Sequence, residues 1–360
     1  MPAHDVIIIG AGLAGLTAAC VLTESGRTVT VLEGSRYAGG RIRTVTDIAT
    51  GRALADLGPT WVWPTYQPVV AAWLHRLRIA TFPQYDDGDG ILDGWGAGVE
   101  RHLIPGQAGI ARVVGGPGAL IAALAARLPE GTVSTGRPVA RVEEHDGATI
   151  GVGLASGETL RARFVILAVP LRVAASTVAL PGLDPALMSA MRRTPTWMSS
   201  QAKAVALYDR PFWRAAGLSG QIASRNGPLG EAHDHTPHDE GVGAIFGFVG
   251  WSPSQRRADP PGLQRAIVAQ LGRCLGQQGE RPTALHIQDW ATSPFVATAA
   301  DIDELPEHPA VGPTILRTPQ FDGRLLLAAS ETSHVSPGLI EGALAAGERA
   351  AQQVLAMSSG

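Results

Sequence analysis

The sequence predicts an α/β fold of two domains. In residues 5–33, a β-branched run is followed by glycines at G-x-G-x-x-G spacing, an apolar repeat of helical period and a second short strand. A strand, a helix and a strand in this order form a βαβ unit, which builds a parallel sheet. The chain of 360 residues is long enough for a second folding unit, and the pattern of strands changes after about residue 191.

Gly10, Gly12 and Gly15 each meet a separate requirement of a dinucleotide-binding loop. One glycine lets the chain turn sharply, one lets the backbone approach a pyrophosphate, and one lets the helix pack against the strand. The helix N-terminus then offers free N–H groups to the phosphates. Glu33 is placed to bind a ribose diol, and its charge disfavours the 2′-phosphate of NADP. The motif predicts a bound dinucleotide without specifying which one; the alternative is that the glycines only punctuate a core helix.

The composition favours a protein that acts on small molecules. The formal charge of −3 and the pI near 6.4 provide no basic surface for nucleic acid or an anionic membrane. No segment approaches the roughly 20 apolar residues that span a membrane. Cys20 and Cys274 are too few for a disulfide framework and are expected to be buried free thiols. We therefore expect a cytoplasmic protein.

Lysine is almost absent from the chain. Of the 29 basic residues only Lys203 is a lysine, so the other positive charges are carried by arginine. Unlike a guanidinium, a lysine amine is compact and can shift its pKa when it is buried. Lys203 is therefore a candidate functional residue, although a single lysine can also be structural.

Two segments after the first βαβ unit indicate contact with a bulky ligand. Gly39 and Gly40 allow close backbone approach, and Arg41 would place a guanidinium beside phosphates. The alternative is a surface turn with a solvated arginine. In residues 55–64, two tryptophans lie in an irregular stretch, where they either line a flat ligand or anchor the loop to the core.

Periodicity and turn residues place the remaining elements. Helices are expected at residues 69–77, 119–128, 263–275 and 338–354, and strands at residues 132–134, 138–143, 150–154, 159–163, 164–169, 199–207, 243–251, 283–290 and 324–329.

Two polar stretches resemble metal sites but are expected to be solvated loops. Residues 84–98 contain DDGDG, but no glutamate follows at the twelfth position of a calcium loop. Residues 231–240 carry His233, His235 and His238 among carboxylates, and their spacing fits neither a helix face nor a zinc ribbon. No metal is expected.

Together these segments resemble the flavin-dependent monoamine and polyamine oxidases, a family within the glutathione-reductase-like FAD class. The resemblance runs from residue 5 to residue 355 and rests on the N-terminal βαβ unit, LEGSRYAGGR, DLGPTWVWP, QAKAVALYDRPFWR and ASETSHVSPGLIEGALAAGERAA. It implies a Rossmann-type FAD-binding domain, discontinuous over residues 1–65, 109–192 and 315–360. A smaller mixed-sheet substrate domain would then comprise residues 66–108 and 193–314.

The resemblance also implies which residues hold FAD. Val139 falls at the adenine-side contact, Glu331 at the ribityl chain, and the helix that begins near Leu339 and Ile340 points at the flavin C2 carbonyl. The expected cofactor-binding residues are Gly10, Ala11, Gly12, Ala14, Gly15, Glu33, Gly34, Ser35, Gly39, Gly40, Arg41, Gly58, Pro59, Thr60, Trp61, Val139, Ala168, Trp290, Ser330, Glu331, Leu339 and Ile340.

In this family the lysine that matches Lys203 holds a water near flavin N5, so Lys203 is the expected catalytic residue. Ala299 falls where some members carry a flavin-linked cysteine, which implies non-covalent FAD. Ala300 and Leu339 replace the two aromatic residues that usually sandwich the amine. The pocket is therefore expected to be walled by other aromatic side chains from the set Trp61, Trp63, Phe246, Phe248 and Trp290.

The segment of residues 66–110 is much shorter than the helical insertion found there in relatives, so a reduced lid over the pocket is also expected.

The function implied by the resemblance is that of an FAD-dependent amine oxidase. An amine would be oxidised to an imine that hydrolyses to a carbonyl, and O2 would reoxidise the flavin to give hydrogen peroxide. The expected partners are a small amine and O2, and the protein is expected to be a monomer or homodimer. An L-amino acid oxidase, a C–N or C–C desaturase, and a structural or non-redox flavoprotein remain alternatives.

Overall fold

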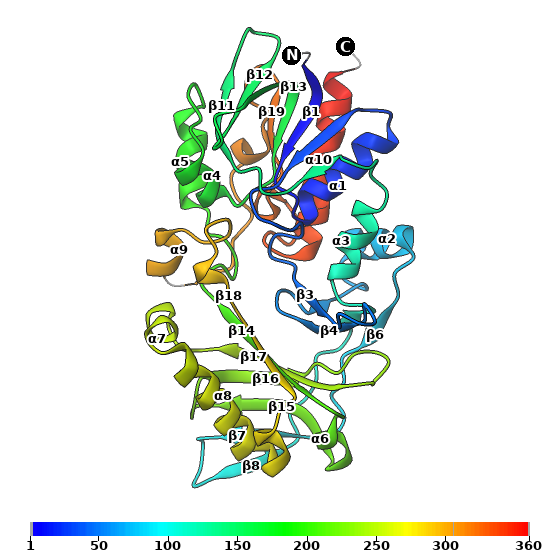
Figure 1. The fold of residues 1–360 in the computed structure, drawn as a ribbon, viewed down its shortest axis with the longest axis vertical. Coiled ribbons are helices and arrows are strands. Elements are labelled where there is room, and N and C mark those ends of the chain that lie inside the picture. Colours follow the sequence, from blue (N-terminus) through cyan, green and yellow to red (C-terminus); the bar gives the residue numbers. More distant parts are fainter. Residues whose placement is uncertain (1–2, 305, 359–360) are drawn as a thin grey trace.

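A computed structural model describes residues 3–304 and 306–358. Two large sheets lie at opposite ends of the elongated molecule, and the two termini meet at one end (Figure 1). The first sheet has the strand order β10-β2-β1-β13-β12-β11, and β19 also pairs with β13. Its strands are β1 (His4–Ile9), β2 (Val29–Leu32), β10 (Val133–Ser134), β11 (Val139–Glu144), β12 (Ile150–Leu154), β13 (Thr159–Leu167) and β19 (Leu325–Leu327).

The apolar run of β1 is buried on both faces of the first sheet. Val6 and Ile8 face one core, while Ile7 and Ile9 face the other. A parallel strand covered by helices on both sides needs such a continuous apolar sequence. The first core contains α1 (Leu13–Glu24), α2 (Pro68–Leu77), α3 (Gly118–Ala125) and α10 (Ile340–Met357); the second contains α4 (Leu171–Thr177) and α5 (Pro185–Arg193).

The second sheet has the order β18-β14-β17-β16-β15-β7-β8. Ala204 and Ala206 of its strand β14 face the core under helix α8, whereas Val205 and Leu207 face the first sheet's side of the molecule. Because successive side chains alternate along a strand, Lys203 shares the face of Val205. The strands are β7 (Asp89–Asp93), β8 (Val99–His102), β14 (Ala202–Tyr208), β15 (Leu218–Ser224), β16 (Leu229–Asp234), β17 (Gly243–Val249) and β18 (Ala284–Asp289), and α8 spans Pro260–Leu275.

Shorter elements accompany the two large sheets. They are the pair β3 (Thr44–Thr46) and β4 (Ala53–Asp56), the three-stranded sheet of β5 (Trp61–Val62), β9 (Ala111–Val113) and β6 (Thr81–Pro83), and the helices α6 (Phe212–Ala215), α7 (Pro253–Ala258) and α9 (Ala299–Asp303). Among the described helices, none combines the length and the apolar character that crossing a bilayer requires.

The α/β fold of two domains is confirmed, but three local predictions are wrong. The two strands expected at residues 159–163 and 164–169 are one strand, β13, which ends at Leu167; its first half pairs with β12 and its last residues pair with β19. Residues 89–93 form β7 inside the second sheet, and residues 231–234 belong to β16. Within these two segments Asp93, Asp234 and His235 are buried, and Asp93 is paired with Arg273, whereas residues 86–88 and 238–240 are exposed.

The domain boundaries remain a proposal. The strands of the second sheet come from residues 89–102 and 202–289, in keeping with a substrate domain of residues 66–108 and 193–314. Helix α2 lies in the first of these segments but packs its Trp73 into the core of the first sheet. We therefore propose that the chain crosses between the domains after α2.

Candidate active site

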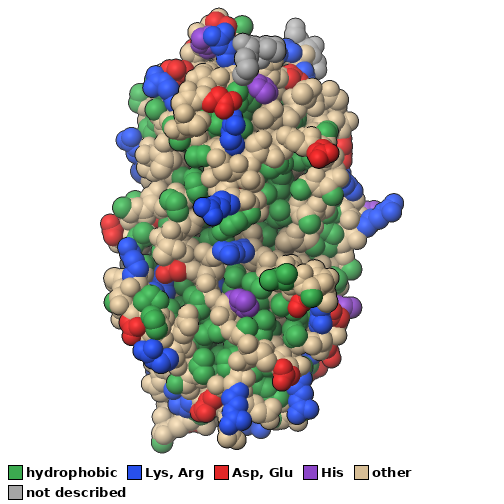
Figure 2. Space-filling view, viewed as in Figure 1, with side chains coloured by type: hydrophobic (Ala, Val, Ile, Leu, Met, Phe, Trp, Pro, Cys, Tyr) green, Lys and Arg blue, Asp and Glu red, His purple; other side chains and the backbone are tan. Residues whose placement is uncertain are grey.

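A cavity of about 1220 Å³ extends from the glycine loop after β1 to strand β14 of the second sheet. On the face shown in Figure 2, hydrophobic side chains gather in the middle of the molecule, and Lys or Arg side chains border them. The cavity therefore lies between the two large sheets and is large enough for an elongated ligand.

The glycines at one end of the cavity are required by close contacts. Gly10 has a φ of 104°, and a Cβ on Gly15 would lie only 2.0 Å from the carbonyl oxygen of Gly10. At Gly12 the nearest protein atom to an added Cβ is Gly40 Cα at 3.9 Å, so this glycine leaves space that a ligand can use. Gly12 is also the N-cap of α1 and makes no side-chain capping bond, so the helix N-terminus is available to an anion.

Glu33 lies on the wall of the cavity at the end of β2. Its carboxylate accepts hydrogen bonds from the backbone N–H of Ala11 at 2.7 Å and of Ser35 at 2.8 Å. These two bonds fix the carboxylate beside the glycine loop. Each carboxylate oxygen can accept further hydrogen bonds, so Glu33 can still bind a diol.

Arg41 links a segment near the N-terminus to a segment near the C-terminus. Its guanidinium forms a two-pronged ion pair with Glu331, at 2.7 and 3.1 Å, and donates to Ser330 Oγ and to the carbonyl oxygen of Trp197. Burial raises the pKa of the Glu331 carboxyl, but Arg41 and the hydrogen bonds around it bring that pKa below its usual value. Both terminal nitrogens of Arg41 are thus bound to protein, and Glu331 lies behind Arg41, off the cavity wall.

Lys203 lies on the cavity wall with its side chain almost fully buried. Its amine donates to the carbonyl oxygen of Gly58 at 3.0 Å and to Thr60 Oγ1, and it lies 4.2 Å from the centre of the Phe246 ring. Burial lowers the pKa of Lys203 from 10.5 to about 7, with the charge of Arg112 acting in the same direction and that of Asp56 opposing it. Near neutral pH the amine can therefore both accept and release a proton.

Aromatic side chains surround the cavity near Lys203. Trp61 is fixed by its indole N–H, which donates to Gln84 Oε1 at 2.8 Å, and Trp290 by a 3.1 Å bond to the carbonyl oxygen of Leu57. Trp63 and Phe248 complete this aromatic wall. All four were among the residues expected to wall the pocket.

Most of the predicted site residues meet at this one cavity. Those on its wall are Gly10, Gly12, Ala14, Glu33, Gly34, Ser35, Gly39, Gly40, Arg41, Gly58, Pro59, Thr60, Trp61, Trp63, Ala168, Lys203, Phe248, Trp290, Ser330, Leu339 and Ile340. Those that do not line it are Ala11, Gly15, Val139, Glu331, Phe246 and Ala300.

The residues off the wall have other positions. Ala11 is buried in the glycine loop and Gly15 in α1, Phe246 is fully buried behind Lys203, and Val139 is half-buried in β11. Ala300 is exposed on α9, a short helix that is capped by Thr298 and held against α4 by a buried Asp301–Arg172 ion pair. The expectation that Ala300 lines the substrate pocket is therefore wrong.

Several wall residues were missed by the sequence analysis. Trp197 and Met198 precede β14 and line the cavity, and Met198 has an unusual φ of 61°. Phe295 packs against Gly34, so closely that a Cβ on this glycine would lie 2.5 Å from the ring. Only the aromatic character of Trp197 and Phe295 could have drawn attention to them. The described residues also hold no group of three or more His, Cys, Asp or Glu side chains suited to a metal ion.

Comparison with known proteins shows that two family models match this chain. The model of the flavin containing amine oxidoreductases matches residues 98–355, and that of an NAD(P)-binding Rossmann-like domain matches residues 8–77. A putrescine oxidase of Kocuria rosea is 25% identical over 468 aligned residues, covering 96% of this chain and 95% of the relative. A flavin-containing amine oxidase of Danio rerio is 24% identical and covers 98% of this chain and 86% of the relative.

Two solved structures show the same fold. Cyclohexylamine oxidase from Brevibacterium oxydans IH-35A superposes with a TM-score of 0.83 at 20% identity, covering 100% of both chains. A putrescine oxidase bound to putrescine superposes with a TM-score of 0.79 at 20% identity, covering 99% of both chains. The alignment with the K. rosea enzyme is longer than the 360 residues of this chain, so that relative carries insertions absent here.

Proposed function

The chain belongs to the family of flavin-containing amine oxidoreductases, and from this membership we propose how its cavity oxidises an amine. It is an FAD-dependent oxidoreductase that acts on CH–NH2 groups. The observation that carries the proposal is the position of Lys203, the sole lysine of the chain, which is buried on the wall of the large cavity. When bound there, FAD takes up the two electrons and the hydrogen of the amine C–H bond.

The residues present fit FAD. The space beside Gly12 admits a pyrophosphate, and the uncapped N-terminus of α1 complements its charge. Glu33 would bind the ribose, and the start of α10 at Leu339 and Ile340 would direct a positive helix end at the flavin. Neither cysteine of the chain lines the cavity, which supports non-covalent binding without a cysteinyl link.

Lys203 would act on the reaction through its amine. The carbonyl oxygen of Gly58 and Thr60 Oγ1 hold two of its hydrogen-bonding directions. A third direction would bind a water or exchange a proton with the substrate, which the pKa of about 7 permits near neutral pH. We further propose that O2 reoxidises the enzyme, giving hydrogen peroxide, and that the protein is cytoplasmic.

The wall of the cavity favours an amine with an apolar body over a diamine. Of its two carboxylates, Glu33 is assigned to the ribose of FAD, and Asp289 is engaged by a bidentate ion pair with Arg256. A distant second ammonium group would therefore lack a free anionic partner. The aromatic wall of Trp61, Trp63, Phe248 and Trp290 instead suits a cyclic or aliphatic monoamine.

Anaerobic mixing of the FAD-loaded protein with aliphatic, cyclic and aromatic monoamines, diamines and amino acids tests the proposal. We expect cyclic or aliphatic monoamines to bleach the flavin absorbance, and diamines of equal length to do so more slowly. A protein whose flavin was bleached by none of these amines would not be an amine oxidase. Bleaching by amino acids alone would favour an L-amino acid oxidase.

A further inference from the structure

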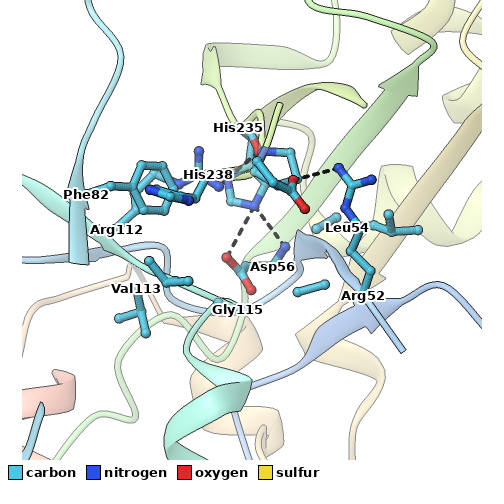
Figure 3. A pocket seen from close by; sticks show the side chains of 15 residues that line it. Arg52, Leu54, Asp56, Phe82, Arg112, Val113, Gly115, His235 and His238 are labelled. Carbon is cyan, nitrogen blue, oxygen red and sulfur yellow. Dashed lines mark hydrogen bonds and ion pairs between the residues drawn. The ribbon is translucent and has the colours of Figure 1, made fainter. Parts of the chain in front are cut away.

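The segment that holds Lys203 is itself held by a buried histidine. Strand β4 ends at Asp56. The chain then passes Gly58 and Thr60, whose oxygens accept the hydrogen bonds of the Lys203 amine. His235, which follows β16, is directed at Asp56, and its Nε2 accepts the backbone N–H of that residue at 2.8 Å (Figure 3). This bond therefore fixes the chain just before the two oxygens that hold the amine.

His235 is fixed from two other strands. Its side chain is fully buried, and its backbone N–H donates to the carbonyl oxygen of Ala244 in β17 at 2.7 Å. Its own carbonyl oxygen accepts a 2.9 Å bond from Arg112 of β9. The other terminal nitrogen of Arg112 donates to the carbonyl oxygen of Thr236 at 2.7 Å. The backbone that carries the His235 ring therefore has partners on both sides.

The ring of His235 also supports another contact of Lys203. It meets the ring of Phe246 edge to face, with the two ring centres 5.2 Å apart. The Lys203 amine lies 4.2 Å from the centre of the same Phe246 ring, where a cation is attracted to the aromatic face. His235 therefore contacts both parts of the protein that hold the amine.

Only the neutral form of His235 can make the bond to Asp56. An imidazole nitrogen accepts an N–H when it carries no proton, so the proton of this ring lies on Nδ1. Burial, aided by the charge of Arg112, lowers the pKa of His235 to about 3. The ring therefore stays neutral between pH 6 and 9, and its bond to Asp56 does not titrate in this range.

The side chains around His235 also act on Lys203 through their charges. Burial is the main cause of the low pKa of Lys203; the carboxylate of Asp56 opposes it and the guanidinium of Arg112 adds to it. The Asp56 carboxylate is fixed by a 2.7 Å bond from Thr44 Oγ1. Because Asp56 supplies its backbone N–H to His235 and its charge to Lys203, the two effects can be separated by substitution.

We propose that His235 is a positioning residue for Lys203. It does not line the large cavity. Through its bond to Asp56 and its contact with Phe246, it keeps the partners of the Lys203 amine in place. This role rests on the proposed part of Lys203 in amine oxidation, but the state of the amine can be measured without any substrate.

The test uses the fact that Lys203 is the only lysine in the chain. In the FAD-loaded protein with 13C-labelled lysine, the NMR signal of its Cε should titrate near pH 7. His235→Leu keeps an apolar side chain against Phe246 but removes the acceptor. It should raise the midpoint by about one pH unit or more, because residues 56–60 loosen and water reaches the amine. His235→Gln restores an acceptor and should titrate as the wild type does.

His233→Leu is the matched control. His233 also packs against the Phe246 ring, with ring centres 5.3 Å apart, and also has a buried ring nitrogen without a hydrogen-bond partner. That nitrogen lies 3.9 Å from Glu231 rather than against the backbone of Asp56, so the variant should leave the midpoint unchanged. Asp56→Asn keeps the backbone N–H and removes the charge, so it should lower the midpoint.

The reaction gives a second measurement. On anaerobic mixing with cyclohexylamine and then O2, His235→Leu should slow by about tenfold the phase that Lys203→Met slows, and His235→Gln should not. Equal midpoints in His235→Leu and His235→Gln would overturn the proposal. If no amine reduced the flavin although the midpoints shifted as expected, the positioning of Lys203 would be supported and the proposed oxidation would be contradicted.

The wild type provides a check that does not depend on the folding of His235→Leu. In a spectrum of the protein with 15N-labelled histidine, the ring of His235 is identified as the one that His235→Gln removes. Its Nε2 should be unprotonated and its Nδ1 protonated from pH 6 to 9. A proton on Nε2 would overturn the proposal, because that nitrogen could not then accept the N–H of Asp56.

Discussion

The two ends of the large cavity recognise their ligand by different means. At the end beside β1, the glycines and the N-terminus of α1 present backbone groups, and the Glu33 carboxylate is held beside them by two backbone N–H bonds. At the end beside β14, recognition depends on side chains from distant parts of the chain, with Lys203 held by Gly58 and Thr60. A site built from backbone groups needs glycines at a fixed spacing, which can be recognised in the sequence. A site built from side chains brings together residues that are far apart in the sequence, so it can be recognised only in the folded protein.

The largest expected effect tests the Arg41–Glu331 pair, which links N-terminal and C-terminal segments of the chain beside the cavity. Arg41→Met leaves Glu331 buried without its counter-charge and should lower the free energy of unfolding by about 3–5 kcal/mol, measured by urea denaturation. Adding Glu331→Leu should recover much of that loss. Arg43→Met, which removes only exposed contacts with Gln288 and Tyr37, is the control and should cost little. Equal losses in the two arginine variants would show that Arg41 is not a structural link.

The next prediction distinguishes a loss of FAD binding from a loss of stability at the end of the cavity beside β1. Gly12→Ala should weaken FAD binding roughly 100-fold, about 2.7 kcal/mol, because the Cβ would enter the space for the pyrophosphate. The apoprotein should keep its stability, since no protein atom lies within 3.4 Å of that Cβ. Gly26→Ala should do the opposite, costing about 1 kcal/mol of stability through its φ of 80° while leaving FAD affinity unchanged. Fluorescence titration with FAD distinguishes these outcomes, and unchanged affinity in Gly12→Ala would contradict the backbone site.

The effect that is smallest per pH unit concerns the end of the cavity beside Lys203. Lys203 has a pKa of about 7 in the folded protein and 10.5 when unperturbed, so between these values the unfolded chain binds more protons. The free energy of unfolding should therefore rise with pH between about 7 and 10.5, by at most about 1.4 kcal/mol per pH unit from this residue. Lys203→Met should remove that contribution. Parallel pH curves for the two proteins in urea denaturation would show that the pKa of Lys203 is not lowered.

The same difference between the two ends explains what the sequence could predict. The βαβ unit, GGR and the returning strand and helix near residues 324–354 were found because each is a local pattern. Lys203 was identified from the composition, because it is the only lysine in the sequence. Strand β7 was missed because the pairing of its Asp93 with Arg273 depends on a contact 180 residues away. His235 was assigned to a solvated loop because its burial against Asp56 is likewise set by distant chain.

The central claim is that Lys203 takes part in amine oxidation at the large cavity. Its most direct test is rapid anaerobic mixing with cyclohexylamine, followed by exposure to O2, for the FAD-loaded protein and its Lys203→Met variant between pH 6 and 9. We predict that the wild type shows a pH dependence centred near 7, and that the variant loses this dependence and is slower by about 100-fold in one of the two phases. Identical rates and pH profiles in both proteins would contradict the account.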